Sequence, residues 1–263
     1  MVRFTGERPT EGSTPDSLLA LHAAGYREVR ARLGPGRVLD TGCGLGEGTS
    51  SLAGSGRTVV GADYDPTTAL AAHRRHRFPA ACMDAAGLGI RTGGVDWVCS
   101  SHLVEHFAAP ETHIAELARV VEPGGAAFVV TPNAPADFEN PFHLVLFRRH
   151  ELETALRAHF DDVRVWGLAG SDAVKEDFAR RRRTGRRLVA FDVLDLRHKV
   201  PRRWYIAAYS LLLRIVYRLL GNRYSGGATG ITVDDFFLTD DVDDSTPVLF
   251  AVACQPRRSA SSS

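Results

Sequence analysis

The sequence predicts an α/β fold that is doubly wound, with a mainly parallel sheet covered by helices on both faces. Strand and helix patterns alternate along the chain, which is typical of parallel strands joined by helical crossovers. The predicted buried strands are short apolar segments near 37–42, 58–63, 80–84, 95–101 and 125–131. The 263 residues are enough for one such domain with a large core and an insertion.

Helices are predicted between these strands and on either side of them. A helix over 17–33 ends at Gly34-Pro35-Gly36 and would cover the ligand pocket from the N-terminal side. The helices between the strands fall near 47–54, 66–75 and 112–121. After the fifth strand we expect a helix over 148–160, a sixth strand over 162–168 and a seventh over 246–253.

A glycine-rich turn joins the first strand to the helix that begins at Glu47. Gly42, Gly44 and Gly46 stand at alternate positions directly after Asp40. Glycine at such positions lets the backbone approach a ligand that a side chain would hold away. Tight strand–helix turns also use glycine for steric reasons alone, so the turn by itself leaves both interpretations open.

The second strand ends in Asp63, close to the spacing of about 20 residues between a glycine turn and a ribose-binding carboxylate. A carboxylate accepts two hydrogen bonds, so it suits a 2′,3′-diol and repels a 2′-phosphate. Glu47 lies in the first turn of the next helix, where it would repel a pyrophosphate. We therefore expect a ligand that contains adenosine without phosphates.

These residues resemble the class I S-adenosylmethionine-dependent methyltransferases. The likeness covers residues 36–133 and includes the segment around Asp84, the Glu105-His106 pair and the Pro123-Gly124-Gly125 turn. The segments 4–8, 131–133 and 140–143 extend it toward the type-11-like branch, which is associated with O-methylation of glycans and small molecules. The resemblance implies a seven-stranded Rossmann-like sheet whose last strand lies antiparallel between strands five and six.

The same resemblance implies S-adenosyl-L-methionine as the cofactor and a binding site at the carboxyl ends of the strands. Asp84 is expected to accept a hydrogen bond from the adenine amine. The expected cofactor residues are Asp40, Gly42, Cys43, Gly44, Gly46, Asp63, Tyr64, Asp84, Ala85, Ser100 and Ser101.

A hydroxyl acceptor must lose its proton as the methyl group is transferred, and a positioned base accelerates such a step about 10²–10⁴-fold. We expect His143 to be this base, with His106 as the second candidate and Glu105 orienting either one. A structural role for His143, bracing the loop after strand five, is the alternative. His22 could also approach the cofactor.

No metal site is expected from the sequence. The aspartates between 234 and 244 lack the ligand spacing and the turn glycine of a calcium loop, so a solvated loop is the favoured interpretation. The four cysteines form no C-x-x-C pair and suit a buried, reduced state. The N-terminal segment has no apolar region like that of a signal peptide, so we expect a cytoplasmic protein.

We divide the chain into four parts. Residues 1–36 form a tail and cover helix, 37–168 the cofactor-binding core, 169–245 a helical insertion, and 246–263 the final strand and tail. An insertion between strands six and seven would lie over the crevice where open α/β sheets bind ligands, so we expect an acceptor-recognition cap.

Two segments of the insertion each allow two interpretations. The arginine-rich run over 180–187 is either an anion site or a solvated helix face. The basic and apolar segment 202–223 either contacts an anionic membrane surface or packs on this domain or a partner subunit. Arginines interrupt its apolar stretch, so it does not suit a membrane span.

The expected function is O-methylation of a hydroxyl on a sugar, oligosaccharide or glycosylated small molecule. Segments 229–232 and 243–246 are similar to methyltransferases that act on the glycan of mycofactocin. A quinone or lipid methyltransferase and a cofactor-binding regulatory protein are the alternatives. RNA methylation is disfavoured, because the net charge is only +1 and no RNA-binding module is present.

Overall fold

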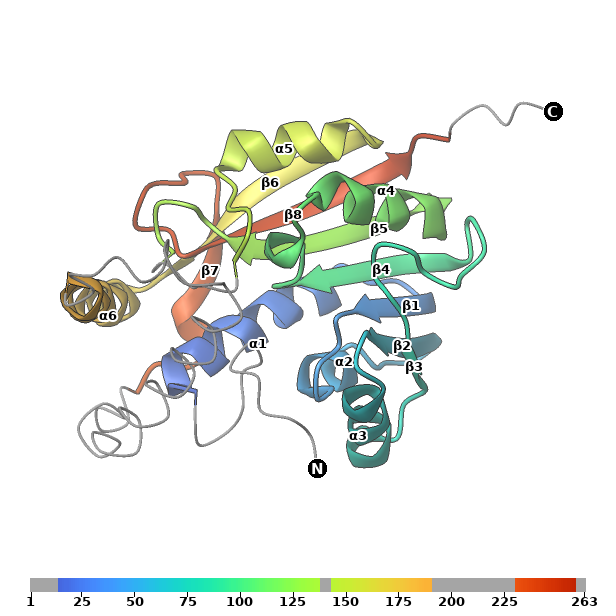
Figure 1. The fold of residues 1–263 in the computed structure, drawn as a ribbon, viewed down its shortest axis with the longest axis horizontal. Coiled ribbons are helices and arrows are strands. Elements are labelled where there is room, and N and C mark those ends of the chain that lie inside the picture. The colour runs from blue at the N-terminus through green and yellow to red at the C-terminus, as the bar shows by residue number, and fades with distance from the viewer. Residues whose placement is uncertain (1–13, 138–142, 191–229, 259–263) are drawn as a thin grey trace.

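The computed structural model describes residues 14–137, 143–190 and 230–258, and within them one mixed sheet has the strand order β3-β2-β1-β4-β5-β8-β6-β7 (Figure 1). Five strands pair in parallel: β1 (Gly36–Thr41), β2 (Arg57–Asp63), β3 (Ala80–Cys82), β4 (Val95–Ser101) and β5 (Val121–Pro132). β8 (Val248–Pro256) runs antiparallel between β5 and β6 (Phe160–Gly170). The predicted α/β class and the place of the last long strand are confirmed.

Helices cover both faces of the sheet, and neighbouring strand residues point into different cores. On one face lie α4 (Pro110–Val120) and α5 (Arg149–Arg157), and on the other α1 (Asp16–Arg30) and the start of α6 (Asp172–Ala190). Val129 packs into the first core, whereas Phe128 packs into the second, as strand alternation requires. The shorter helices are α2 (Glu47–Ser51), α3 (Pro66–His76), η1 (Val104–His106) and η2 (Val233–Asp235).

The expectation of seven strands is wrong, because the structure has an eighth. β7 (Phe236–Thr239) pairs antiparallel with residues Gly167–Gly170 of β6 at the edge of the sheet. Phe236 is buried in the core, whereas Phe237 is 48% exposed, so the segment alternates as a half-buried strand does. The aspartates on both sides of this four-residue strand favoured a loop in the sequence. Part of the expected insertion therefore belongs to the sheet.

Several predictions fall outside the described residues. They concern the apolar segment 202–223 and the motif at 4–8. They also concern residue 229 of the segment 229–232 and residues 140–142 of the segment 140–143, both of which were part of the family resemblance. α6 confirms a helix over the arginine-rich region, although its side chains are described only to Arg183. In the part of the chain that the structure describes, no helix is long and apolar enough to cross a membrane.

Phe250 gives a test of the packing on the α1 face. Its ring is fully buried in β8, with centroids 6.5 Å from Phe128 and 6.2 Å from Trp166. Phe250→Ala should lower the free energy of unfolding by about 3–5 kcal/mol through lost burial and a residual cavity. Phe237→Ala, at an exposed position of β7, should change it by less than about 1 kcal/mol. Urea unfolding of both variants is the measurement, and equal losses would contradict this packing.

Candidate functional site at the carboxyl edge of the sheet

The glycine turn follows β1 and adopts a backbone that other residues rarely allow. Gly42, Gly44 and Gly46 have φ angles of 72°, 55° and 91°. A Cβ on Gly46 would lie 2.7 Å from the Phe78 ring, so glycine is required there for space as well as for conformation. The Gly44 amide donates to Asp63 Oδ2 at 3.1 Å, which ties the turn to the end of β2.

Asp40 braces this turn from inside the protein. Its side chain is fully buried and accepts hydrogen bonds from Thr49 Oγ1 at 2.5 Å and from the Tyr26 hydroxyl at 3.1 Å. Burial raises the pKa of Asp40 to about 6, although the hydrogen bonds from Thr49 and Tyr26 act in the opposite direction. Asp40 thus joins α1, β1 and α2. Its expected contact with the cofactor stays a prediction.

Asp63 lies where the sequence predicted, at the end of β2 and beside the turn. Its Oδ1 accepts from the Asp65 amide at 2.9 Å, and the residue is 4% exposed. Tyr64 next to it is 64% exposed, which leaves a large aromatic face at this edge. Glu47, at the start of α2, pairs with Arg75 at 2.7 Å, so its charge is partly compensated.

The ends of β3 and β4 are joined by a buried histidine that the sequence analysis left without a role. His113 Nδ1 donates to the carbonyl of Ala85 at 2.9 Å, and its Nε2 accepts from the Ser100 hydroxyl at 2.9 Å. Burial lowers the pKa of His113 despite the nearby carboxylates. Ser100 is fully buried, and His113 links it to the segment around Asp84 and Ala85. Its expected contact with the cofactor stays a prediction.

Glu105 is a fully buried carboxylate at the centre of the expected catalytic group. Thr131 Oγ1, from the end of β5, donates to Glu105 Oε2 at 2.9 Å. Burial acts to raise the pKa of Glu105, but the proximity and charge of His102 and the charges of His106 and His143 lower it overall. Glu105 Oε1 has no hydrogen-bond partner among the described residues, and His102 Nδ1 lies 3.6 Å from it.

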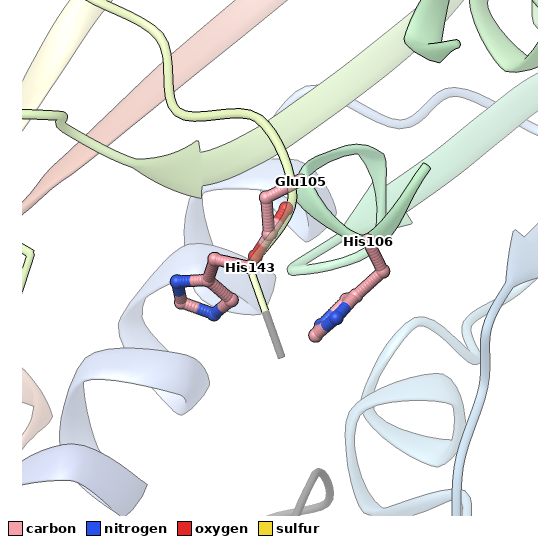
Figure 2. Close-up of side chains that lie close together, drawn as sticks. All are labelled: Glu105, His106 and His143. Carbon is pink, nitrogen blue, oxygen red and sulfur yellow. The ribbon is translucent and has the colours of Figure 1, made fainter. Parts of the chain in front are cut away.

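The three expected catalytic residues do lie together. One ligand-type atom from each of Glu105, His106 and His143 falls within 4.8 Å of the others, and Figure 2 shows the three side chains close together. His143 Nδ1 lies 3.1 Å from Asp137 Oδ2. Although burial acts to lower the pKa of His143, this hydrogen bond and the charges of Asp137 and Glu105 raise it overall.

Two further histidines border this group. His102 has a φ of 51°, a left-handed conformation that is uncommon for a residue other than glycine. Its ring centroid lies 4.0 Å from that of His22 on α1, and burial, followed by the charge of His102, lowers the pKa of His22 well below its ordinary value. His102 and Asp137 were missed as site residues. The position of His102 directly after the fourth strand could have indicated that it belongs to the site, whereas no sequence motif includes Asp137.

Comparison with known proteins gives the family. Residues 39–129 match the methyltransferase domain family. A Mycobacterium tuberculosis protein described as a probable S-adenosylmethionine-dependent methyltransferase is 32% identical over 191 residues, 68% of this chain and 69% of the relative. The chain belongs to the S-adenosylmethionine-dependent methyltransferases.

Other members of this methyltransferase family match over shorter stretches. A protein of the same description from Mycolicibacterium smegmatis is 34% identical over 150 residues, and the match spans 53% of this chain and 58% of that relative. A ubiquinone biosynthesis O-methyltransferase of Thiobacillus denitrificans is 34% identical over 118 residues, 41% of this chain and 50% of that protein.

A solved methyltransferase structure supports the fold over nearly the whole chain. It comes from Thermotoga maritima and is described as a possible histamine N-methyltransferase. The match has a TM-score of 0.57 at 13% identity and covers 90% of this chain and 91% of that one. At such low identity the likeness concerns the fold alone.

The residues at the carboxyl edge fit the cofactor of this methyltransferase family. Asp63 offers a carboxylate at the end of β2, and the glycine turn presents backbone beside it. Ser101, at the end of β4, has a buried hydroxyl without a hydrogen-bond partner among the described residues, as expected for a group that meets a ligand. Asp84 is exposed after β3 and accepts from the Ala86 amide at 2.9 Å.

The pKa of Asp40 predicts a pH dependence of stability. Because the folded chain holds the Asp40 proton more tightly than the unfolded chain, its contribution is full below about pH 4 and is lost as the pH rises through about 6. The shift corresponds to about 3 kcal/mol. The wild-type chain should therefore lose about this much stability relative to Asp40→Asn between pH 4 and 7. The measurement is urea unfolding of both chains across this pH range. A difference in unfolding free energy that does not change with pH would contradict a raised pKa of Asp40.

Proposed function

We propose that this chain transfers the methyl group of S-adenosylmethionine to a hydroxyl of a sugar, an oligosaccharide or a glycosylated small molecule. When bound, the cofactor supplies a methyl group that its sulfonium has already activated. The observation that supports oxygen as the acceptor atom is the part-buried pair of His143 and Asp137, which lies beside Glu105. A hydroxyl needs a base more than most nitrogen or carbon acceptors do.

His143 suits the role of that base because Asp137 sets its tautomer. A carboxylate accepts hydrogen bonds, so the proton of a neutral His143 sits on Nδ1 and the lone pair on Nε2. Glu105 and Asp137 both favour the imidazolium that forms when Nε2 takes a proton. His106 lies edge-on to His143, with ring centroids 5.2 Å apart, and is the second candidate for the base.

The proposal of a glycan acceptor rests on the sequence resemblance and on the long insertion before the final strand, which we expect to form an acceptor-recognition cap. α6 follows β6, and both Val174 near its start and Ile231 pack into the core on the α1 face. We assign acceptor recognition to the expected insertion, 169–245, apart from β7. A mycofactocin glycan is the narrower proposal and rests only on the similarity of 229–232 and 243–246.

A quinone or lipid acceptor is the second candidate. The likeness to a ubiquinone biosynthesis O-methyltransferase favours it, because that relative methylates oxygen and shares the cofactor core. The basic and apolar segment 202–223 would then contact the membrane surface. Binding to anionic vesicles, followed by loss of binding when this segment is made polar, would favour the lipid acceptor over the glycan.

The acceptor can be found with labelled S-adenosylmethionine and fractionated host extract, tracking products that gain the mass of one methylene. With that acceptor, His143→Ala should lower kcat about 10²–10⁴-fold, because the hydroxyl loses its base. Its affinity for S-adenosylhomocysteine should stay unchanged. His150→Ala, at an exposed histidine of α5, is the matched control and should retain full turnover.

Asp137→Asn separates a base from a purely structural histidine. Because the hydrogen bond to Asp137 raises the pKa of His143, the acidic limb of kcat/KM should move to lower pH in this variant. Near-normal turnover of His143→Ala, or an acidic limb that Asp137→Asn leaves in place, would contradict the base role.

A further inference from the structure

The cluster of Glu105, His106 and His143 has the composition of a metal site as well as that of a catalytic base. Its ligand-type atoms all lie within 4.8 Å of one another (Figure 2). The backbone holds the cluster together, because the amides of Leu144 and Val145 both donate to the Glu105 carbonyl, at 2.7 and 3.2 Å. His143 is thus fixed against η1, which supplies the other two residues.

Two carboxylates lie at this place, and the described residues put no permanent cation beside them. Glu105 is fully buried, and Asp137 stands next to His143 with its side chain 10% exposed. Among the described residues, the ion-pair partners of these carboxylates are histidines, with neither lysine nor arginine among them. A buried carboxylate without a permanent cation beside it is costly. One divalent cation would balance both charges.

An unpartnered atom gives independent support for a ligand. Glu105 Oε2 is anchored by Thr131, whereas Oε1 is buried without a hydrogen-bond partner among the described residues. A buried acceptor without a donor costs about 1–3 kcal/mol, and more when it is charged. Such atoms in a native protein commonly mark an ion, a water or a ligand.

Asp137 completes the pattern seen around metal-bound histidines. A carboxylate that accepts from one ring nitrogen of a histidine fixes the ring and directs the other nitrogen to the metal. The hydrogen bond from His143 Nδ1 to Asp137 does this and leaves Nε2 as the ligating atom. Two imidazoles and one carboxylate favour a transition-metal dication such as Zn²⁺, whereas Mg²⁺ and Ca²⁺ prefer oxygen ligands.

We propose that Glu105, His106 and His143 bind a divalent transition-metal ion of the Zn²⁺ type, with Asp137 orienting His143 and a further coordination position open to the acceptor. Ligand atoms around tetrahedral zinc lie about 3.4 Å apart, so side-chain rotations must draw the three residues closer than they are here. The role of the ion rests on the proposed hydroxyl acceptor, but its binding does not. His143 is the proposed base of the metal-free site. With the ion bound it would be a ligand instead, and the ion would lower the pKa of the bound hydroxyl, whose proton would pass to solvent.

The test uses the full, untagged chain after removal of metal with a chelator. Titration with Co²⁺ alone should produce visible ligand-field absorption that saturates at one equivalent and that Zn²⁺ displaces. His106→Ala and His143→Ala should each weaken Co²⁺ binding at least about 10-fold, and Asp137→Asn about 10–100-fold. His150→Ala should bind Co²⁺ as the wild type does.

Binding of S-adenosylhomocysteine is measured by calorimetry on the same samples. It shows that each variant is folded, and it tests the cofactor site independently of the metal site. Absence of saturable Co²⁺ absorption, or equal Co²⁺ affinity in the wild type and in His106→Ala and His143→Ala, would overturn the metal site. Intact binding of S-adenosylhomocysteine in the same samples would leave the methyltransferase proposal in place. Co²⁺ binding to a chain that does not bind S-adenosylhomocysteine would support the metal site and contradict the proposed function.

Discussion

Parallel pairing of β1 with β2 and β4 determines where the chemistry of this protein lies. The register sets Thr41 opposite both Ala62 and Ser100, so the residues that follow these three strands emerge at one level of one edge. The glycine turn, Asp63 and Ser101 follow directly from this register. Parallel β5 brings Thr131 to the same edge, where it anchors Glu105. Neighbouring strands thus gather residues that are far apart in sequence.

Two buried carboxylates at this edge show how surroundings set different roles. Asp40 is enclosed between α1, β1 and α2, and burial dominates, so its pKa rises to about 6 and its main effect is to hold the turn. Glu105 is equally buried, but the surrounding histidines lower its pKa. One carboxylate therefore braces the cofactor turn, whereas the other places negative charge beside the proposed base.

Features that depend on short stretches of sequence could be predicted. The strands of the parallel half and the place of Asp63 follow from apolar runs and from one short motif, and the Glu105-His106 pair follows from the family resemblance. Contacts between distant segments could not be predicted in this way. The burial of Asp40 depends on Tyr26 from α1, and Ser100 is covered by His113 from α4. β7 is only four residues long, and its strand character depends on pairing with β6.

The hydrogen bond between His143 and Asp137 is local in sequence but was equally hard to predict, since neither residue lies in a helix or strand that would set their spacing. Together with Glu105, this pair places the proposed acceptor chemistry next to the proposed cofactor residues. A crystal structure of the chain with S-adenosylhomocysteine tests this placement. We expect the ribose hydroxyls to donate to Asp63 and the sulfur to face Glu105, His106 and His143. A sulfur directed away from this cluster, or a ribose that does not contact Asp63, would contradict it.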